Sequence, residues 1–149
     1  MSETDALRGF ITAQDSGQPS AYERAMAELR SGRKRSHWIW FVLPQLDGLG
    51  RSAMAQRYGL NGLEEANAYL AEPLLRSRLE ETIAVIADQL AQPGQTLVRL
   101  MGGQLDASKT ISSLTLFAAA GLPEARVLLA QIGQSCEVTQ SRIGMADGV

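Results

Sequence analysis

The sequence has few of the residues on which disulfides, metal sites and membrane spans depend. Cys136 is its only cysteine, so no disulfide can form within the chain, and a lone thiol suits a reducing compartment. His37 is its only histidine and cannot supply the two or three imidazoles of most zinc sites, so we expect no metal and no other cofactor. No run of about 18 apolar residues occurs, and the acidic start of the chain does not resemble a signal peptide. We therefore expect a cytoplasmic protein without a membrane span.

The chain also lacks a strong excess of charge of either sign. Its formal net charge is −2 at pH 7, which is not the basic balance of a general nucleic-acid binder. Its 149 residues fall in the usual size range of one domain, and 45% of them are hydrophobic, as in ordinary globular proteins. We predict one domain over residues 1–149 and rank nucleic acid low among the expected partners.

Helix signals occupy most of the chain. Ser20 and Glu23 have the spacing of a capping box, and Thr4 or Asp5 is placed to cap the first helix. The longest stretch with helical periodicity begins at Pro73, a residue suited to the first helical turn. Shorter helices are expected at 52–60, 63–71, 96–101, 107–120 and 123–133.

One stretch, from Trp38 to Leu43, has an ambiguous pattern. Its apolar composition fits a buried strand, but Ser36 before it and Pro44 after it also fit a short buried helix. No other stretch offers a partner strand, so we favour a helix. The sequence thus predicts an all-α fold, a single compact domain of about six to eight short to medium helices, with a frayed tail from about Ser141.

The stretch 32–45 combines both tryptophans and the only histidine with three consecutive cations. Aromatic rings beside arginine and lysine can stack a base while the cations hold phosphate. The alternative is that the aromatic residues fill the core and the cations are solvated after a helix end. His37 has a similar pair of readings, as a general base near neutral pH or as a hydrogen-bonded structural residue.

A second stretch, 106–117, places Lys109 and Ser112 on one side of a predicted helix. A cation with a hydroxyl one turn further on would suit a phosphate or a carboxylate, whereas small residues in a helix also serve close packing. The glycine-rich stretch 48–52, which ends at a serine cap, fits an ordinary turn better than an anion site.

Several stretches together resemble one bacterial family. Residues 32–46 and 48–52, Lys109 and residues 112–117 closely resemble domain-of-unknown-function family 1810, and the opening Phe10–Asp15 is also typical of it. The resemblance covers about residues 7–133. It implies a compact, mainly helical fold and brings no activity with it.

These observations favour a domain that binds an anionic or nucleotide-like small molecule, and whether it also catalyses a reaction stays open. The candidate ligand-binding residues are Arg33, Lys34, Trp38, Gln45, Lys109 and Ser112, and His37 is the candidate catalytic residue. In this hypothesis Arg33 and Lys109 hold the anion, Trp38 stacks on the ligand, and His37 moves a proton. The alternative is a protein-interaction module without catalysis, in which the tryptophan-rich stretch anchors a partner or a second copy of the chain.

Overall fold

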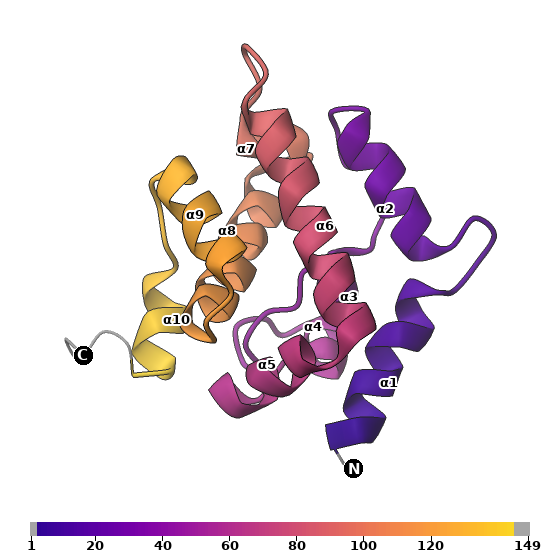
Figure 1. Cartoon of the computed structure of the whole chain (residues 1–149), viewed down its shortest axis with the longest axis vertical. Coiled ribbons are helices and arrows are strands. Elements are labelled where there is room, and N and C mark those ends of the chain that lie inside the picture. The colour runs from indigo at the N-terminus through magenta and orange to yellow at the C-terminus, as the bar shows by residue number, and fades with distance from the viewer. Residues whose placement is uncertain (1–2, 145–149) are drawn as a thin grey trace.

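The computed structural model describes residues 3–144 and contains ten α-helices and no sheet in that part of the chain (Figure 1). The helices are α1 Glu3–Gln14, α2 Ala21–Arg30, α3 Ile39–Val42, α4 Ala53–Tyr58, α5 Gly62–Ala71, α6 Pro73–Leu90, α7 Leu97–Leu100, α8 Gln104–Ala119, α9 Pro123–Ile132 and α10 Glu137–Arg142. The predicted all-α single domain is confirmed. The predicted number of helices is too low, because several helices have only four to six residues and leave almost no periodic pattern in the sequence.

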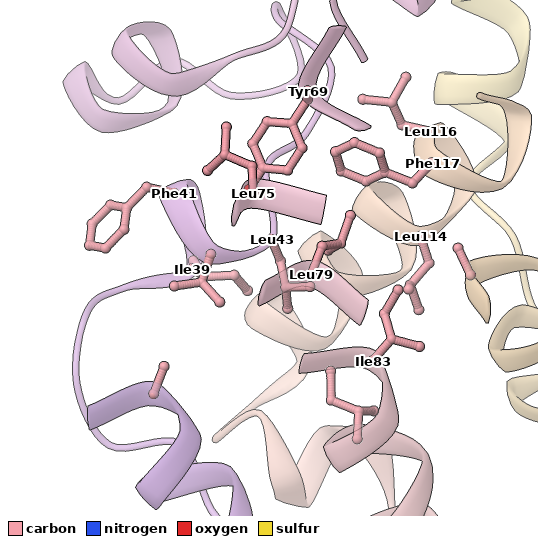
Figure 2. Packing of buried hydrophobic residues seen from close by; sticks show 14 of the residues in the cluster. Ile39, Phe41, Leu43, Tyr69, Leu75, Leu79, Ile83, Leu114, Leu116 and Phe117 are labelled. Atoms are coloured by element: carbon pink, nitrogen blue, oxygen red, sulfur yellow. The ribbon is translucent and has the colours of Figure 1, made fainter. Parts of the chain in front are cut away.

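Helix α6 is the central element of the domain. It runs through the middle of the molecule, with α1 and α2 on one side and α8 and α9 on the other (Figure 1). Its apolar stripe includes Leu75, Leu79 and Ile83, which are all buried. In the core these side chains meet Leu43, which follows α3, and Leu114 of α8 (Figure 2).

Local sequence signals fix several of the helix ends. The Ser20 hydroxyl accepts from the Glu23 backbone N–H and the Glu23 carboxylate accepts from the Ser20 backbone N–H, so the predicted capping box is confirmed. Ser52 caps α4 in the same way, and Pro73 lies in the first turn of α6. The predicted cap at Thr4 or Asp5 is wrong, because α1 already begins at Glu3.

The tryptophan-rich stretch forms a short helix within mostly irregular backbone. The four residues of α3 confirm the helix that we favoured over a strand. After α3, Leu46 and Leu60 form an isolated parallel bridge, the one β-pairing among residues 3–144. Asp47 N–H donates to the Leu60 carbonyl at 2.7 Å, and Leu60 N–H donates to the Gln45 carbonyl at 2.8 Å. The bridge holds the stretch that leads into α4 against the stretch that follows it.

The C-terminal part adds a helix that the sequence analysis missed. Helix α10 packs beside α8 (Figure 1), and its first turn is capped by the Cys136 sulfur, which accepts from the Thr139 backbone N–H at 3.5 Å. Ser141 and Arg142, at the start of the predicted frayed tail, are the last two residues of this helix. Ile143 and Gly144 follow the helix, and residues 145–149 of that predicted tail lie outside the described residues. None of the helices in the described range is long and apolar enough to cross a bilayer.

Candidate functional site

Asp106, in the first turn of α8, lies between two lysines. Lys34 Nζ is 2.8 Å from Asp106 Oδ2, and Lys109 Nζ is 3.5 Å from Asp106 Oδ1. Each lysine also lies over a tryptophan ring, Lys34 over Trp38 and Lys109 over Trp40, both at 5.1 Å from the ring centroid. The site therefore consists of two lysine–tryptophan pairs joined by one carboxylate.

The first pair, Lys34 and Trp38, is buried, and both side chains donate hydrogen bonds to other residues of the protein. The side chain of Lys34 is 6% exposed, and its ammonium also donates to the Ser36 carbonyl at 2.6 Å. Trp38 is 1% exposed, and its indole Nε1 donates to Glu28 at 2.9 Å. Because Asp106 is closest to the buried Lys34 ammonium, that ion pair is the stronger one. The ion pair between Lys34 and Asp106 connects the stretch after α2 to the start of α8.

Glu28, in the last turns of α2, holds the other end of this stretch. Its carboxylate accepts from the backbone N–H groups of Arg35 and Ser36 at 2.7 and 2.9 Å, from the Ser36 hydroxyl and from the indole of Trp38. Burial raises the pKa of Glu28, but these hydrogen bonds outweigh it and lower the pKa to about 2. Glu28 is therefore ionised throughout the physiological pH range.

The second pair borders an open groove of about 440 Å³. The groove lies between the stretch 45–55, the first half of α8 and the start of α10. Its polar side chains are those of Gln45, Arg51, Ser52, Ser108, Lys109 and Ser112, with the thiol of Cys136. Leu49, Leu105 and Val138 form its apolar walls. The volume falls within the range of small-molecule sites.

The groove has a positive electrostatic character. Lys109 and Arg51 line it, and no carboxylate from residues 3–144 does. Asp106 lies next to Lys109, but its charge is matched by the closer Lys34, so the three groups together carry a net charge of about +1 at neutral pH. The Lys109 ammonium is thus available to an anion in the groove.

A chain of hydrogen bonds joins the α8 wall of the groove to the start of α10. The hydroxyls of Ser112 and Thr139 are 3.0 Å apart, and the Thr139 hydroxyl donates to the Cys136 sulfur at 3.2 Å. Burial raises the pKa of the Cys136 thiol, but hydrogen bonds from Thr139, Ser112 and the Val138 backbone outweigh it and lower the pKa below its ordinary value. The thiolate is therefore favoured at this wall of the groove.

The structure brings three of the predicted site residues together and separates the others from them. Gln45, Lys109 and Ser112 come from two distant parts of the chain and line the same groove. Lys34 and Trp38 lie behind it in the core, where the buried ring has no surface on which a ligand could stack.

Arg33 and His37 lie outside the groove. Arg33 is exposed just after α2. His37 is exposed too, and its ring stacks against Trp40 with the centroids 6.5 Å apart. Trp40 thus contacts both His37 and Lys109.

The polar groove residues that the sequence analysis did not name as candidates are Arg51, Ser52, Ser108 and Cys136. A signal for Arg51 was present in the glycine-rich stretch 48–52, which brings a cation next to a helix cap. Cys136 had no such signal, because the helix that it caps is only six residues long. Among residues 3–144, no group of three or more histidine, cysteine, aspartate or glutamate side chains is placed to hold a metal ion.

The fold and the groove define a small helical domain with a cationic, partly apolar depression. The model of the family described as "Protein of unknown function (DUF1810)" matches residues 4–142, and the chain belongs to that family. The family match extends the expected resemblance over α10.

A solved structure with a similar fold is that of the conserved hypothetical protein Rv1873 from Mycobacterium tuberculosis. The two sequences are 40% identical, the TM-score is 0.82, and the match covers 93% of this chain and 96% of that chain. No curated protein matches the chain significantly.

Proposed function

We propose that the domain binds an anionic small molecule with an apolar body in the groove between the stretch 45–55, α8 and α10. The observation that carries this proposal is the lining itself, which within the described part of the chain includes the cations Arg51 and Lys109 and no carboxylate. Hydrogen-bonding groups from Gln45 and Ser112 lie in the same groove and can orient a carboxylate or a phosphate.

The paired charges behind the groove support an anion over a neutral ligand. Lys34 neutralises Asp106 from the buried side, and Asp106 in turn is near enough to restrict where the Lys109 ammonium lies. A ligand anion therefore meets a positioned cation and does not have to displace a strong ion pair. Positioning of this kind lowers the entropic cost of binding.

The walls of the groove support an apolar body on the ligand. Leu105 is 71% exposed and Val138 is 55% exposed. Both border the groove from opposite helices, α8 and α10. Contact with a ligand would remove this apolar surface from water and contribute to affinity.

The same geometry argues against a nucleotide base stacked on a tryptophan. Trp38 is buried, and the ring of Trp40 is already in contact with Lys109 and His37. His37 lies at the outer end of this contact, where it would exchange a proton with a ligand that extends across Trp40. We propose binding as the primary function, with His37 as the proton carrier if a reaction follows.

Burial of the tryptophans also counts against the protein-interaction module. That hypothesis needs an exposed tryptophan anchor, whereas Trp38 is buried and Trp40 is only partly exposed.

A thermal-shift and calorimetry screen tests the proposal. Inorganic phosphate, adenosine monophosphate and a series of straight-chain carboxylates are added to the wild type and to Lys109→Gln and Arg51→Gln. At 100 times its Kd a ligand stabilises the fold by about 2.7 kcal/mol, which raises Tm by about 5–10 °C in a domain of this size. We expect carboxylates to bind more tightly as the chain lengthens, and each cation variant to lose at least about ten-fold in affinity.

Arg35→Gln is the matched control, because Arg35 is exposed beside the site and does not line the groove. It removes one positive charge without touching the lining. Equal losses in Arg35→Gln and Lys109→Gln would show a diffuse charge effect and refute a site in the groove.

A further inference from the structure

Trp40 carries a buried hydrogen-bond donor that the described part of the chain leaves unpaired. Its indole Nε1 is shielded from solvent and has no partner among residues 3–144, whereas the Trp38 indole donates to Glu28. Native proteins pair nearly all buried donors, because leaving one unpaired costs folding free energy. Ser113 Oγ is also buried and unpaired, but Ser113 borders no part of the groove. Trp40 Nε1 is therefore the donor that a bound molecule can use.

Trp40 itself lines a small recess next to the groove. Trp40 and Tyr58 line the recess, whose volume is about 10 Å³. Gln45, Gly50 and Ala55 border both the recess and the groove. A space of this size holds about one water-sized group, so it can accept a single oxygen atom but no ring.

Close backbone packing makes the recess narrow. A Cβ atom on Gly50 would lie 2.8 Å from the Ala55 Cβ, and a Cβ atom on Gly59 would lie 2.7 Å from the Asp47 Cα. Both glycines line the recess. The two stretches joined by the Leu46–Leu60 bridge thus leave room for about one atom in the recess that Trp40 lines.

We propose that Trp40 Nε1 donates a hydrogen bond to an acceptor oxygen that the groove ligand extends into the recess. This inference rests on the proposed function. It narrows the ligand to an anion with a short apolar body and a carbonyl or similar oxygen away from the charged group. Lys109 and Arg51 bind the negatively charged group of the ligand, and the Trp40 indole N–H favours ligands that carry this additional acceptor oxygen.

The first test uses the two indole N–H signals in the ¹H–¹⁵N spectrum of the full chain. Trp40→Phe identifies which of the two signals belongs to Trp40. The labelled protein is titrated with 4-oxopentanoate, which carries a ketone oxygen, and with pentanoate, which has the same charge and chain length without it. We expect both to shift groove resonances and only 4-oxopentanoate to move the Trp40 indole signal downfield.

Two variants test the contact by affinity. Trp40→Phe keeps an aromatic ring and removes the donor, and Leu46→Phe fills the recess from a residue that does not line the groove. Each is expected to weaken 4-oxopentanoate by about five-fold and to leave pentanoate within about two-fold of wild type. Trp38→Phe is the matched control, since it removes the indole N–H that Glu28 already binds, and it should leave the ratio of the two affinities unchanged.

The outcomes separate the two proposals. Groove shifts with an unmoved Trp40 signal, or equal losses for both ligands in Leu46→Phe, would overturn the Trp40 contact and keep the anion site. A recess that holds only an ordered water would give this result. No shift with either anion at saturating concentration would reject the anion site and the Trp40 contact together.

Discussion

The two lysine–tryptophan pairs contain the same residue types at the same distance and differ in almost every other respect. Lys34 and Trp38 are buried, and each has a protein acceptor for its donors. Lys109 and Trp40 are partly exposed, and the Trp40 indole has no protein acceptor in the described chain. The buried pair uses its interactions within the fold, whereas the outer pair keeps a charge and a donor for another molecule.

This difference separates stability from binding within one segment. Asp106 joins the pairs through its two ion pairs, and the backbone of α3 joins the two tryptophans. Substitutions of the buried side should mainly lower the free energy of unfolding, and substitutions of the outer side should mainly lower affinity. Four predictions test this division.

The largest effect is expected for Glu28→Ala. It leaves the indole N–H of Trp38 and the backbone N–H groups of Arg35 and Ser36 without their acceptor. We expect a loss of about 3 kcal/mol in the free energy of unfolding, measured by urea denaturation. Glu64→Ala, at an exposed helix position, should cost less than about 0.5 kcal/mol. Equal losses in the two variants would contradict the role of Glu28.

A smaller loss is expected for Lys34→Met, which breaks the buried ion pair with Asp106. Because Asp106 keeps Lys109 nearby and is 23% exposed, we expect about 2 kcal/mol, less than for a fully buried pair. Lys109→Met should cost under about 1 kcal/mol in the same assay while it removes anion binding. The division would fail if Lys109→Met were the more destabilising of the two.

The third prediction is an acid-dependent loss of stability that comes from Glu28. Its pKa of about 2 in the folded protein lies below the ordinary value of 4.5. The contribution is therefore fully present above pH 4.5 and is lost as the pH falls from about 4.5 to about 2. Solvent screening at this partly exposed group reduces the effect to about 1–2 kcal/mol. Urea denaturation between pH 2 and 6 should show a shallower acid decline for Glu28→Gln than for wild type.

The smallest expected effect is a shift in the pH dependence of alkylation at Cys136, which lines the groove. Because hydrogen bonds lower its pKa, alkylation by iodoacetamide should reach half its maximal rate at a lower pH than in an unfolded control. Thr139→Val removes the hydroxyl donor and should shift this midpoint upward by a fraction of a pH unit. An unchanged midpoint in Thr139→Val would mean that the hydroxyl does not stabilise the thiolate.

Much of the fold could be predicted because its signals are local. The capping box at Ser20, the cap at Ser52 and the proline at position 73 each act within one helical turn, so a short stretch of sequence contains the whole interaction. Helix α10 could not be predicted in this way. Its cap is a cysteine, an uncommon capping residue, and its packing surface lies on α8.

The candidate site was only partly predictable for a related reason. The sequence marks Trp38 and Trp40 alike, and nothing local says which ring is buried. Glu28 decides this by accepting from the Trp38 indole, and Asp106 decides which lysine is buried with it. Glu28 and Asp106 both lie outside the tryptophan-rich stretch 32–45. The composition of that stretch alone therefore could not show which of its residues are structural and which are proposed to bind a ligand.

The hydrogen bonds of Glu28 also have a consequence for the order of folding. They join residues only 7 to 10 positions apart, so the loop that they close is short and its closure entropy is small. The groove instead needs residues 45–55 to meet α8 and the region around Cys136, across most of the length of the chain. Contacts of low sequence separation form early and distant ones late. The protein therefore assembles the structural half of this segment before the chain has come together to create the surface that its other half serves.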